Sequence, residues 1–144
     1  MILEDEQATL ALGARLAKAL MSGDAITLSG PLGVGKTALA RGLIEALGHL
    51  GEVPSPSFAI VQPYDELDLP VWHVDLFRIE DRSELDELGL EAADEGVLVV
   101  EWPEMAGASG WPHALGLTLE FAEGGARRLT AEVPASWQGR WPPA

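Results

Sequence analysis

The stretch from Gly30 to Thr37, which reads G-P-L-G-V-G-K-T, constrains the fold of this chain more than any other feature. It matches the pattern G-x-x-x-x-G-K-[S/T] without a gap. A short apolar run over residues 25–29 precedes it, and residues 36–47 follow with apolar side chains at helical spacing before Gly48. Strand, glycine loop and helix in this order predict a phosphate-binding loop in an α/β domain.

The residues of this loop suit the phosphates of a nucleotide. Glycines let the backbone curl so that its N–H groups point inward, and the positive end of the following helix completes an anion cradle. Lys36 can reach the β- and γ-phosphates, and Thr37 offers a hydroxyl to Mg²⁺. A glycine-rich turn that matches by accident is the alternative, and the strand and helix around the match argue against it. The predicted nucleotide contacts are Gly30, Leu32, Gly33, Val34, Gly35, Lys36, Thr37 and Ala38.

The absence of asparagine bears on which base is bound. GTPases usually add an Asn-Lys-x-Asp element for guanine, and this chain contains no asparagine. The predicted cofactors are therefore ATP and Mg²⁺.

The composition of the chain argues against nucleic acids and membranes as direct partners. The formal net charge of −14 opposes contact with phosphate backbones, so we expect no binding of DNA and only indirect contact with tRNA. There are no cysteines, and no basic stretch leads into an apolar segment at the start. No apolar run approaches the roughly 20 residues that cross a bilayer. We expect a cytoplasmic protein that does not enter a membrane.

The rest of the chain predicts one P-loop NTPase domain over residues 1–134, with a central β-sheet flanked by helices. Asp5 is expected to cap a first helix that ends before Ser22, and Ser83 to open a short acidic helix that Gly89 closes. Apolar runs predict strands at 59–61, 71–74 and 97–100, and a C-terminal hairpin at 115–121 and 129–133. The tail, 135–144, shows no periodicity and is expected to be poorly ordered.

Two acidic residues follow buried strands directly. Asp75 comes after the run 71–74, and Glu101 after 97–100. Ligands of open α/β sheets lie beyond the carboxyl ends of the strands, so both acids are expected near the phosphates. Phosphoryl transfer needs a carboxylate at the metal and often another group to place water. Lys36, Asp75 and Glu101 are thus the candidate catalytic residues, with surface acids at strand ends as the alternative for the last two.

The histidines and the proline-bracketed serines carry weaker signals. His49, His73 and His113 are widely spaced, match no metal motif and are predicted to be structural. Ser55 and Ser57 are either turn residues or part of a switch loop that senses the γ-phosphate, and the pattern leaves both interpretations open.

Several segments of the chain together form a distinctive pattern: Asp5-Glu6-Gln7-Ala8-Thr9, Gly30 to Gly42, Ser55-Pro56-Ser57-Phe58, His73-Val74-Asp75-Leu76-Phe77-Arg78, Glu84-Leu85 to Gly89 and Glu101-Trp102-Pro103-Glu104. In these segments, from Asp5 to about Glu104, the chain resembles the TsaE family, the small ATPases of bacterial tRNA threonylcarbamoyladenosine (t6A) biosynthesis. The pattern departs from the family at Ser57, where threonine is usual, and at Pro31, where an acid is common.

This resemblance implies specific roles. Thr37 and Glu101 would contact Mg²⁺, and Asp75 would support hydrolysis. Ser55 to Ser57 would form a switch-like loop, with Ser57 at the nucleotide, and Glu6 would lie near the adenine. The family implies an accessory ATPase whose partners, a threonylcarbamoyl transferase and its paralogous subunit, modify adenosine at position 37 of tRNAs.

Two other functions use the same loop. A stand-alone small-molecule kinase would need an acceptor site and a lid with arginines, for which Arg78 and Arg82 are the central candidates. A non-hydrolysing, ATP-dependent binding module is the other alternative, and the presence of both Asp75 and Glu101 argues against it.

Overall fold

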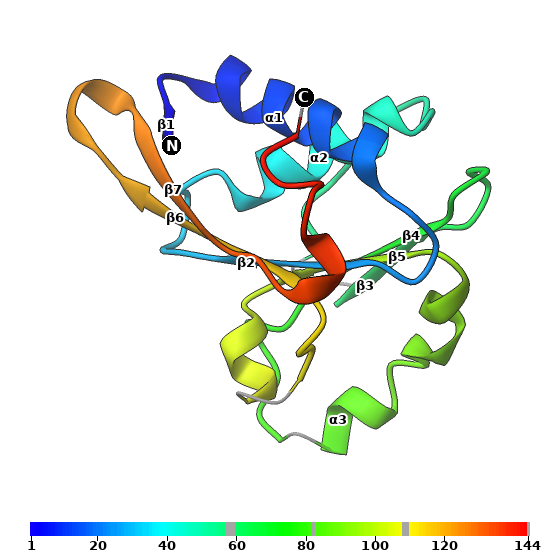
Figure 1. Cartoon of the computed structure of the whole chain (residues 1–144). Coiled ribbons are helices and arrows are strands. Elements are labelled where there is room, and N and C mark those ends of the chain that lie inside the picture. The colour runs from blue at the N-terminus through cyan, green and yellow to red at the C-terminus, as the bar shows by residue number, and fades with distance from the viewer. Residues whose placement is uncertain (57–59, 82, 108–109, 144) are drawn as a thin grey trace.

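The computed structural model describes residues 1–56, 60–81, 83–107 and 110–143, which form a seven-stranded sheet with helices on both faces (Figure 1). The strands are β1 Ile2–Leu3, β2 Ala25–Ser29, β3 Val61–Tyr64, β4 Val71–Asp75, β5 Val97–Glu101, β6 Leu115–Phe121 and β7 Arg127–Glu132. The helices are α1 Glu6–Ala19, α2 Lys36–Ala46 and α3 Ser83–Asp86, with 3₁₀ segments at Leu90–Glu95, Pro103–Ala106, Glu123–Gly125 and Ala135–Trp137. Among these residues, no helix combines the length and the apolar character that crossing a membrane requires.

The strand order is β1-β7-β6-β2-β5-β4-β3, and the four strands from β6 to β4 run parallel. Their pairing places Leu28 of β2 opposite Glu101 of β5, and Glu101 opposite Asp75 of β4. The glycine loop, which leaves β2 after Ser29, therefore starts at the edge of the sheet where both acids lie. This edge is the place where α/β sheets bind ligands.

The central strands bury both of their faces. Ile26 and Leu28 of β2 and Val99 of β5 pack in the apolar layer that contains α1 and α2. Ala25 and Val100, which alternate with them, pack in the opposite layer, on the side of α3 in Figure 1. Continuous apolar runs are typical of such doubly covered parallel strands. The predicted α/β class with a central sheet is confirmed.

The predicted C-terminal hairpin is confirmed as β6 and β7, and the structure adds its place in the sheet. β6 pairs in parallel with β2, so the hairpin extends the central sheet, and β1 pairs with the far side of β7. The predicted strand at 59–61 differs, because β3 begins only at Val61 and runs to Tyr64, while Ala59 lies outside the described residues.

The predicted capping box at Ser83 is wrong. Ser83 is the first residue of α3, and its N–H donates to Asp81 Oδ1 at 3.0 Å. Glu84 Oε2 accepts from the N–H groups of Glu80 and Asp81. The Asp81 carboxylate thus accepts from the first amide of the helix, and Glu84 reaches back to amides just before it, so these two carboxylates take the place of a serine cap. Gly89 lies in the left-handed region (φ 68°) between α3 and the next 3₁₀ segment.

The expectation of a poorly ordered tail is also contradicted. The Trp137 side chain is fully buried in the layer of α1 and α2. Arg140 donates to both carboxylate oxygens of Asp24, at 2.6 and 3.0 Å, and stacks on the Trp137 ring. The Asp24 carboxylate raises the pKa of Arg140. The buried Trp137 ring and the Arg140 guanidinium thus help to hold a segment that shows no periodic pattern.

Candidate functional site

The phosphate loop depends on glycine at both of its ends. Gly30 has φ 142°, and a Cβ at this position would collide with the carbonyl oxygen of Leu119 in β6. Gly35, with φ 118°, lies in the left-handed region and forms the N-cap of α2. Larger residues would strain the backbone at both positions. The loop therefore presents main-chain amides at a helix N-terminus, which is an anion site.

Lys36 lies along this loop rather than in solvent. Its Nζ donates to the carbonyl oxygens of Gly30 and Pro31, the latter at 3.2 Å, and lies 3.8 Å from the centre of the Trp102 ring. Only 4% of the residue is exposed. Burial lowers the pKa of the Lys36 ammonium, and the nearby carboxylates, Glu101 first, oppose this shift. The arrangement keeps a cation at the mouth of the anion cradle.

Thr37 and Glu101 form the polar centre of the site. Thr37 Oγ1 donates to the two carboxylate oxygens of Glu101 at 3.1 and 3.0 Å, and only 3% of Glu101 is exposed. Asp75 is paired with Glu101 across the strands, and its Oδ1 accepts from the N–H of Phe77 at 2.8 Å.

These oxygen donors fit Mg²⁺, which is usually bound by one or two carboxylates together with substrate phosphates. Within the described ranges, no group of three or more His, Cys, Asp or Glu side chains could hold a metal by itself. Thr37 and Glu101 could therefore contribute oxygen ligands to such a metal site.

His73 is a second side chain that holds the Glu101 carboxylate. Its Nε2 lies 2.6 Å from Glu101 Oε2, and the histidine is fully buried. A carboxylate only accepts hydrogen bonds, so Nε2 is the donor. In the part of the chain that the structure describes, Nδ1 has no hydrogen-bond partner, so the known polar contact of this ring is to Glu101. His73 thereby fixes the orientation of that carboxylate.

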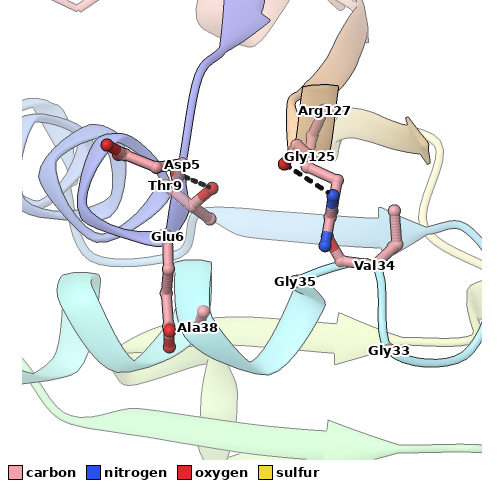
Figure 2. A pocket seen from close by; sticks show the side chains of 9 residues that line it. All are labelled: Asp5, Glu6, Thr9, Gly33, Val34, Gly35, Ala38, Gly125 and Arg127. Carbon is pink, nitrogen blue, oxygen red and sulfur yellow. Dashed lines mark hydrogen bonds between the residues drawn. The ribbon is translucent and has the colours of Figure 1, made fainter. Parts of the chain in front are cut away.

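A cavity of about 220 Å³ adjoins the loop on the side of the hairpin. Figure 2 shows that its walls come from the start of α1, the glycine loop with the start of α2, and the hairpin. Its lining residues are Asp5, Glu6, Thr9, Gly33, Val34, Gly35, Ala38, Gly125 and Arg127. The Asp5 carboxylate itself caps α1 by accepting from the N–H of Ala8 at 2.8 Å. A second hollow joins the same loop residues to Ser55, Asp75, Glu101 and Trp102.

Comparison with known proteins settles the family. A family model described as "Threonylcarbamoyl adenosine biosynthesis protein TsaE" matches residues 3–129. The chain belongs to the TsaE family. The resemblance predicted from the sequence is thus confirmed.

Relatives in this family are named tRNA threonylcarbamoyladenosine biosynthesis protein TsaE. That of Streptomyces coelicolor is 46% identical over 97 residues, and that of Bacillus subtilis is 41% identical over 104 residues. These matches cover 65% and 71% of this chain, and they span 66% and 63% of the two relatives. The crystal structure of Bacillus subtilis YdiB superposes with a TM-score of 0.76 at 28% identity, covering 91% of this chain and 82% of that one.

The structure brings most of the predicted site residues of this TsaE-family chain together. Those that line one or both hollows are Glu6, Leu32, Gly33, Val34, Gly35, Lys36, Thr37, Ala38, Asp75 and Glu101. Gly30 lies at the start of the loop, beneath the Lys36 ammonium. Ser57 lies outside the described residues, as does Arg82, whereas Ser55 lines the second hollow.

Sequence reasoning missed His73 and Arg127. The signal for His73 was present, because residues i and i+2 of a strand lie on one face. Val71 packs in the layer of α1 and α2, so His73 and Asp75 face the same side, beside Glu101. No local pattern linked Arg127 to a loop more than 90 residues earlier, although its Nε donates to the Val34 carbonyl oxygen at 2.8 Å.

Trp102 is expected to report on nucleotide binding. It follows Glu101, holds a left-handed backbone conformation (φ 60°), and its ring contacts Phe77 as well as the Lys36 ammonium. Mg-ATP should draw Lys36 toward its phosphates and change the indole emission. We expect Trp102→Phe to abolish the ATP-dependent fluorescence change. Trp111→Phe, at a residue that lines neither hollow, should retain it, and an undiminished change in Trp102→Phe would contradict the placement of the nucleotide.

Proposed function

We propose that this chain binds and hydrolyses Mg-ATP as an accessory ATPase of t6A biosynthesis. Its partners would be a threonylcarbamoyl transferase and the paralogous subunit of that enzyme, and these would carry out the transfer to tRNA. The observation that carries the proposal is the Thr37–Glu101 pair at the start of α2, beside the Lys36 ammonium. Membership of a family named for t6A biosynthesis supports the pathway.

Different parts of the nucleotide would bind to the loop and to the two hollows. The phosphates would lie on the amides of Gly33 to Lys36 and against the Lys36 ammonium, which exchanges its loop carbonyls for phosphate oxygens. The cavity beside α1 would take the adenine, which accords with the role inferred for Glu6. Its volume of about 220 Å³ suits a base rather than a whole nucleotide.

The acidic residues would serve the other end of the triphosphate. Thr37 and Glu101 would hold Mg²⁺, which neutralises the charge that develops on the phosphates during transfer. His73 and the Thr37 hydroxyl keep the Glu101 carboxylate in one orientation, so little reorganisation is needed when the metal binds. Asp75, on the neighbouring strand, would orient the attacking water.

This division of roles predicts different losses in three variants. Thr37→Ala and Glu101→Ala should weaken Mg²⁺-dependent ATP binding by roughly 10- to 100-fold, the usual range for losing a group that orders a metal site. Asp75→Ala should leave binding within about threefold and lower turnover by roughly 100-fold or more, as loss of a proton-transfer or water-orienting group does.

Calorimetric titration with and without Mg²⁺, together with turnover in the assembled complex, measures both quantities. Glu45→Ala is a matched control, because Glu45 is an exposed carboxylate on the same helix as Thr37. Equal effects of Thr37→Ala, Glu101→Ala and Asp75→Ala on binding alone would refute the assignment.

A further inference from the structure

Arg127, the first residue of β7, joins the C-terminal hairpin to the phosphate loop. Its Nε donates to the carbonyl oxygen of Val34 at 2.8 Å, and its Nη1 donates to those of Gly125 and Ala126 at 2.9 and 3.2 Å. Its guanidinium lies 4.6 Å from the centre of the Phe121 ring. Figure 2 shows the side chain reaching from the hairpin toward Val34 and Gly35. The hairpin turn and an aromatic ring thus hold this cation in one position.

The bond to Val34 acts on a peptide unit of the anion cradle. In a planar trans peptide, the C=O and N–H groups point in opposite directions. A donor fixed on the Val34 oxygen therefore fixes the direction of the next N–H, that of Gly35. Gly35 caps α2, where free amides face a bound anion. A charged donor on the carbonyl also polarises the peptide and strengthens its N–H as a donor.

The choice of residue fits this role. Arginine remains charged at all relevant pH values and presents several donors in a rigid fork, whereas lysine offers a flexible point charge. Here the fork reaches the hairpin turn and the loop at the same time. Its positive charge also lies beside the amides that receive a polyphosphate, in a chain whose net charge is −14.

We propose that Arg127 is a positioning residue that sets the Gly35 amide for the triphosphate through the Val34 carbonyl. This inference rests on the proposed binding of Mg-ATP. Through Arg127, the C-terminal hairpin would contribute to nucleotide binding. Since Arg127 acts on the phosphate loop, its loss lowers the affinity for the triphosphate group, whatever base is attached. A direct contact with the base would instead weaken ATP alone.

The test compares Mg-ATP with Mg-tripolyphosphate, which has the phosphates and no base. Calorimetric titrations use wild-type protein, Arg127→Ala, Arg127→Lys and the control Arg128→Ala, whose arginine is the exposed neighbour on the same strand. We expect Arg127→Ala to lose about 10- to 100-fold in affinity for both ligands, the range of a hydrogen bond to a charged group. Arg127→Lys should recover part of this loss, and Arg128→Ala should match wild type.

An NMR spectrum of the ligand-free protein measures the effect of Arg127 on the Gly35 amide directly. The amide proton of Gly35 should move upfield in Arg127→Ala and stay in place in Arg128→Ala, which a general loss of stability would not produce. Loss of affinity for ATP alone, or unchanged affinity for both ligands, would overturn the inference. Unfolding of both Arg127 variants would assign the residue to stability and overturn it as well. Wild-type protein that binds neither ligand would overturn the proposed function itself.

Discussion

Lys36→Ala is expected to abolish measurable ATP binding while the domain remains folded. Removing one partner of a buried, hydrogen-bonded charge pair costs about 2–5 kcal/mol, which corresponds to roughly 30- to several-thousand-fold in affinity. We expect Lys36 to fall in the upper half of this range, since only 4% of the residue is exposed. Its contacts with the Gly30 and Pro31 carbonyls show that it already reaches over the loop.

The fold should survive this substitution with a modest loss of stability. The variant removes a cation near Glu101, yet Thr37 and His73 continue to bond that carboxylate. Circular dichroism during heating measures the folding, and calorimetry measures the affinity. Lys18→Ala provides the control, because Lys18 is the other lysine of the chain and lies exposed on α1. A folded Lys36→Ala protein with wild-type affinity would rule out the loop as the phosphate site.

Features encoded by neighbouring residues were predictable from the sequence. The glycine loop, its strand and its helix appear where the motif placed them, since a short apolar run, positive-φ glycines and a helical repeat are local signals. The same is true of the Asp5 cap. The approach of Asp75 to Glu101 also followed, because parallel strands end at one edge of a sheet.

Features that join distant segments were not predictable in this way. The alternation of β4 could have placed His73 beside Glu101, but nothing local distinguished it from a structural histidine. Arg127 reaches a loop carbonyl across the sheet, a contact that depends on β6 pairing with β2. The tail is held by isolated anchors, among them the buried indole of Trp137 and the Arg140 guanidinium, and hydrophobic periodicity cannot detect anchors of this kind.

The second large effect concerns turnover. We expect the isolated chain to hydrolyse ATP slowly, to bind tRNA negligibly, and to gain roughly a thousandfold in turnover on joining its partners. Phosphoryl transfer requires cations around the developing charge, and an arginine supplied in trans is worth about 10³–10⁵ in rate. Among the residues that the structure describes, the cations lining the hollow at the acids are Lys36 and Arg41, and Arg41 lies 3.6 Å from Glu6. A partner is the natural source of a further charge.

The surface beside this hollow favours a protein partner over tRNA. Leu32, at the tip of the loop, and Phe77, which contacts Trp102, are exposed by 76% and 53%. Apolar side chains of this size at the mouth of a site suit docking of another protein. The net charge of −14 repels a nucleic-acid backbone, so we expect any effect of tRNA to pass through a more basic companion.

The experiment measures initial rates of ATP hydrolysis for the chain alone, with tRNA, with the transferase and its paralogous subunit, and with all of them together. The Glu101→Ala variant in the full mixture shows how much turnover belongs to this chain, because its partners remain unchanged. Only the mixtures that contain both partners should be fast, and Glu101→Ala should return them to the basal rate. Fast hydrolysis by the chain alone would show that the site is complete without a partner. Stimulation by tRNA in the absence of partners would show that charge repulsion does not control access, and either result would exclude the accessory role.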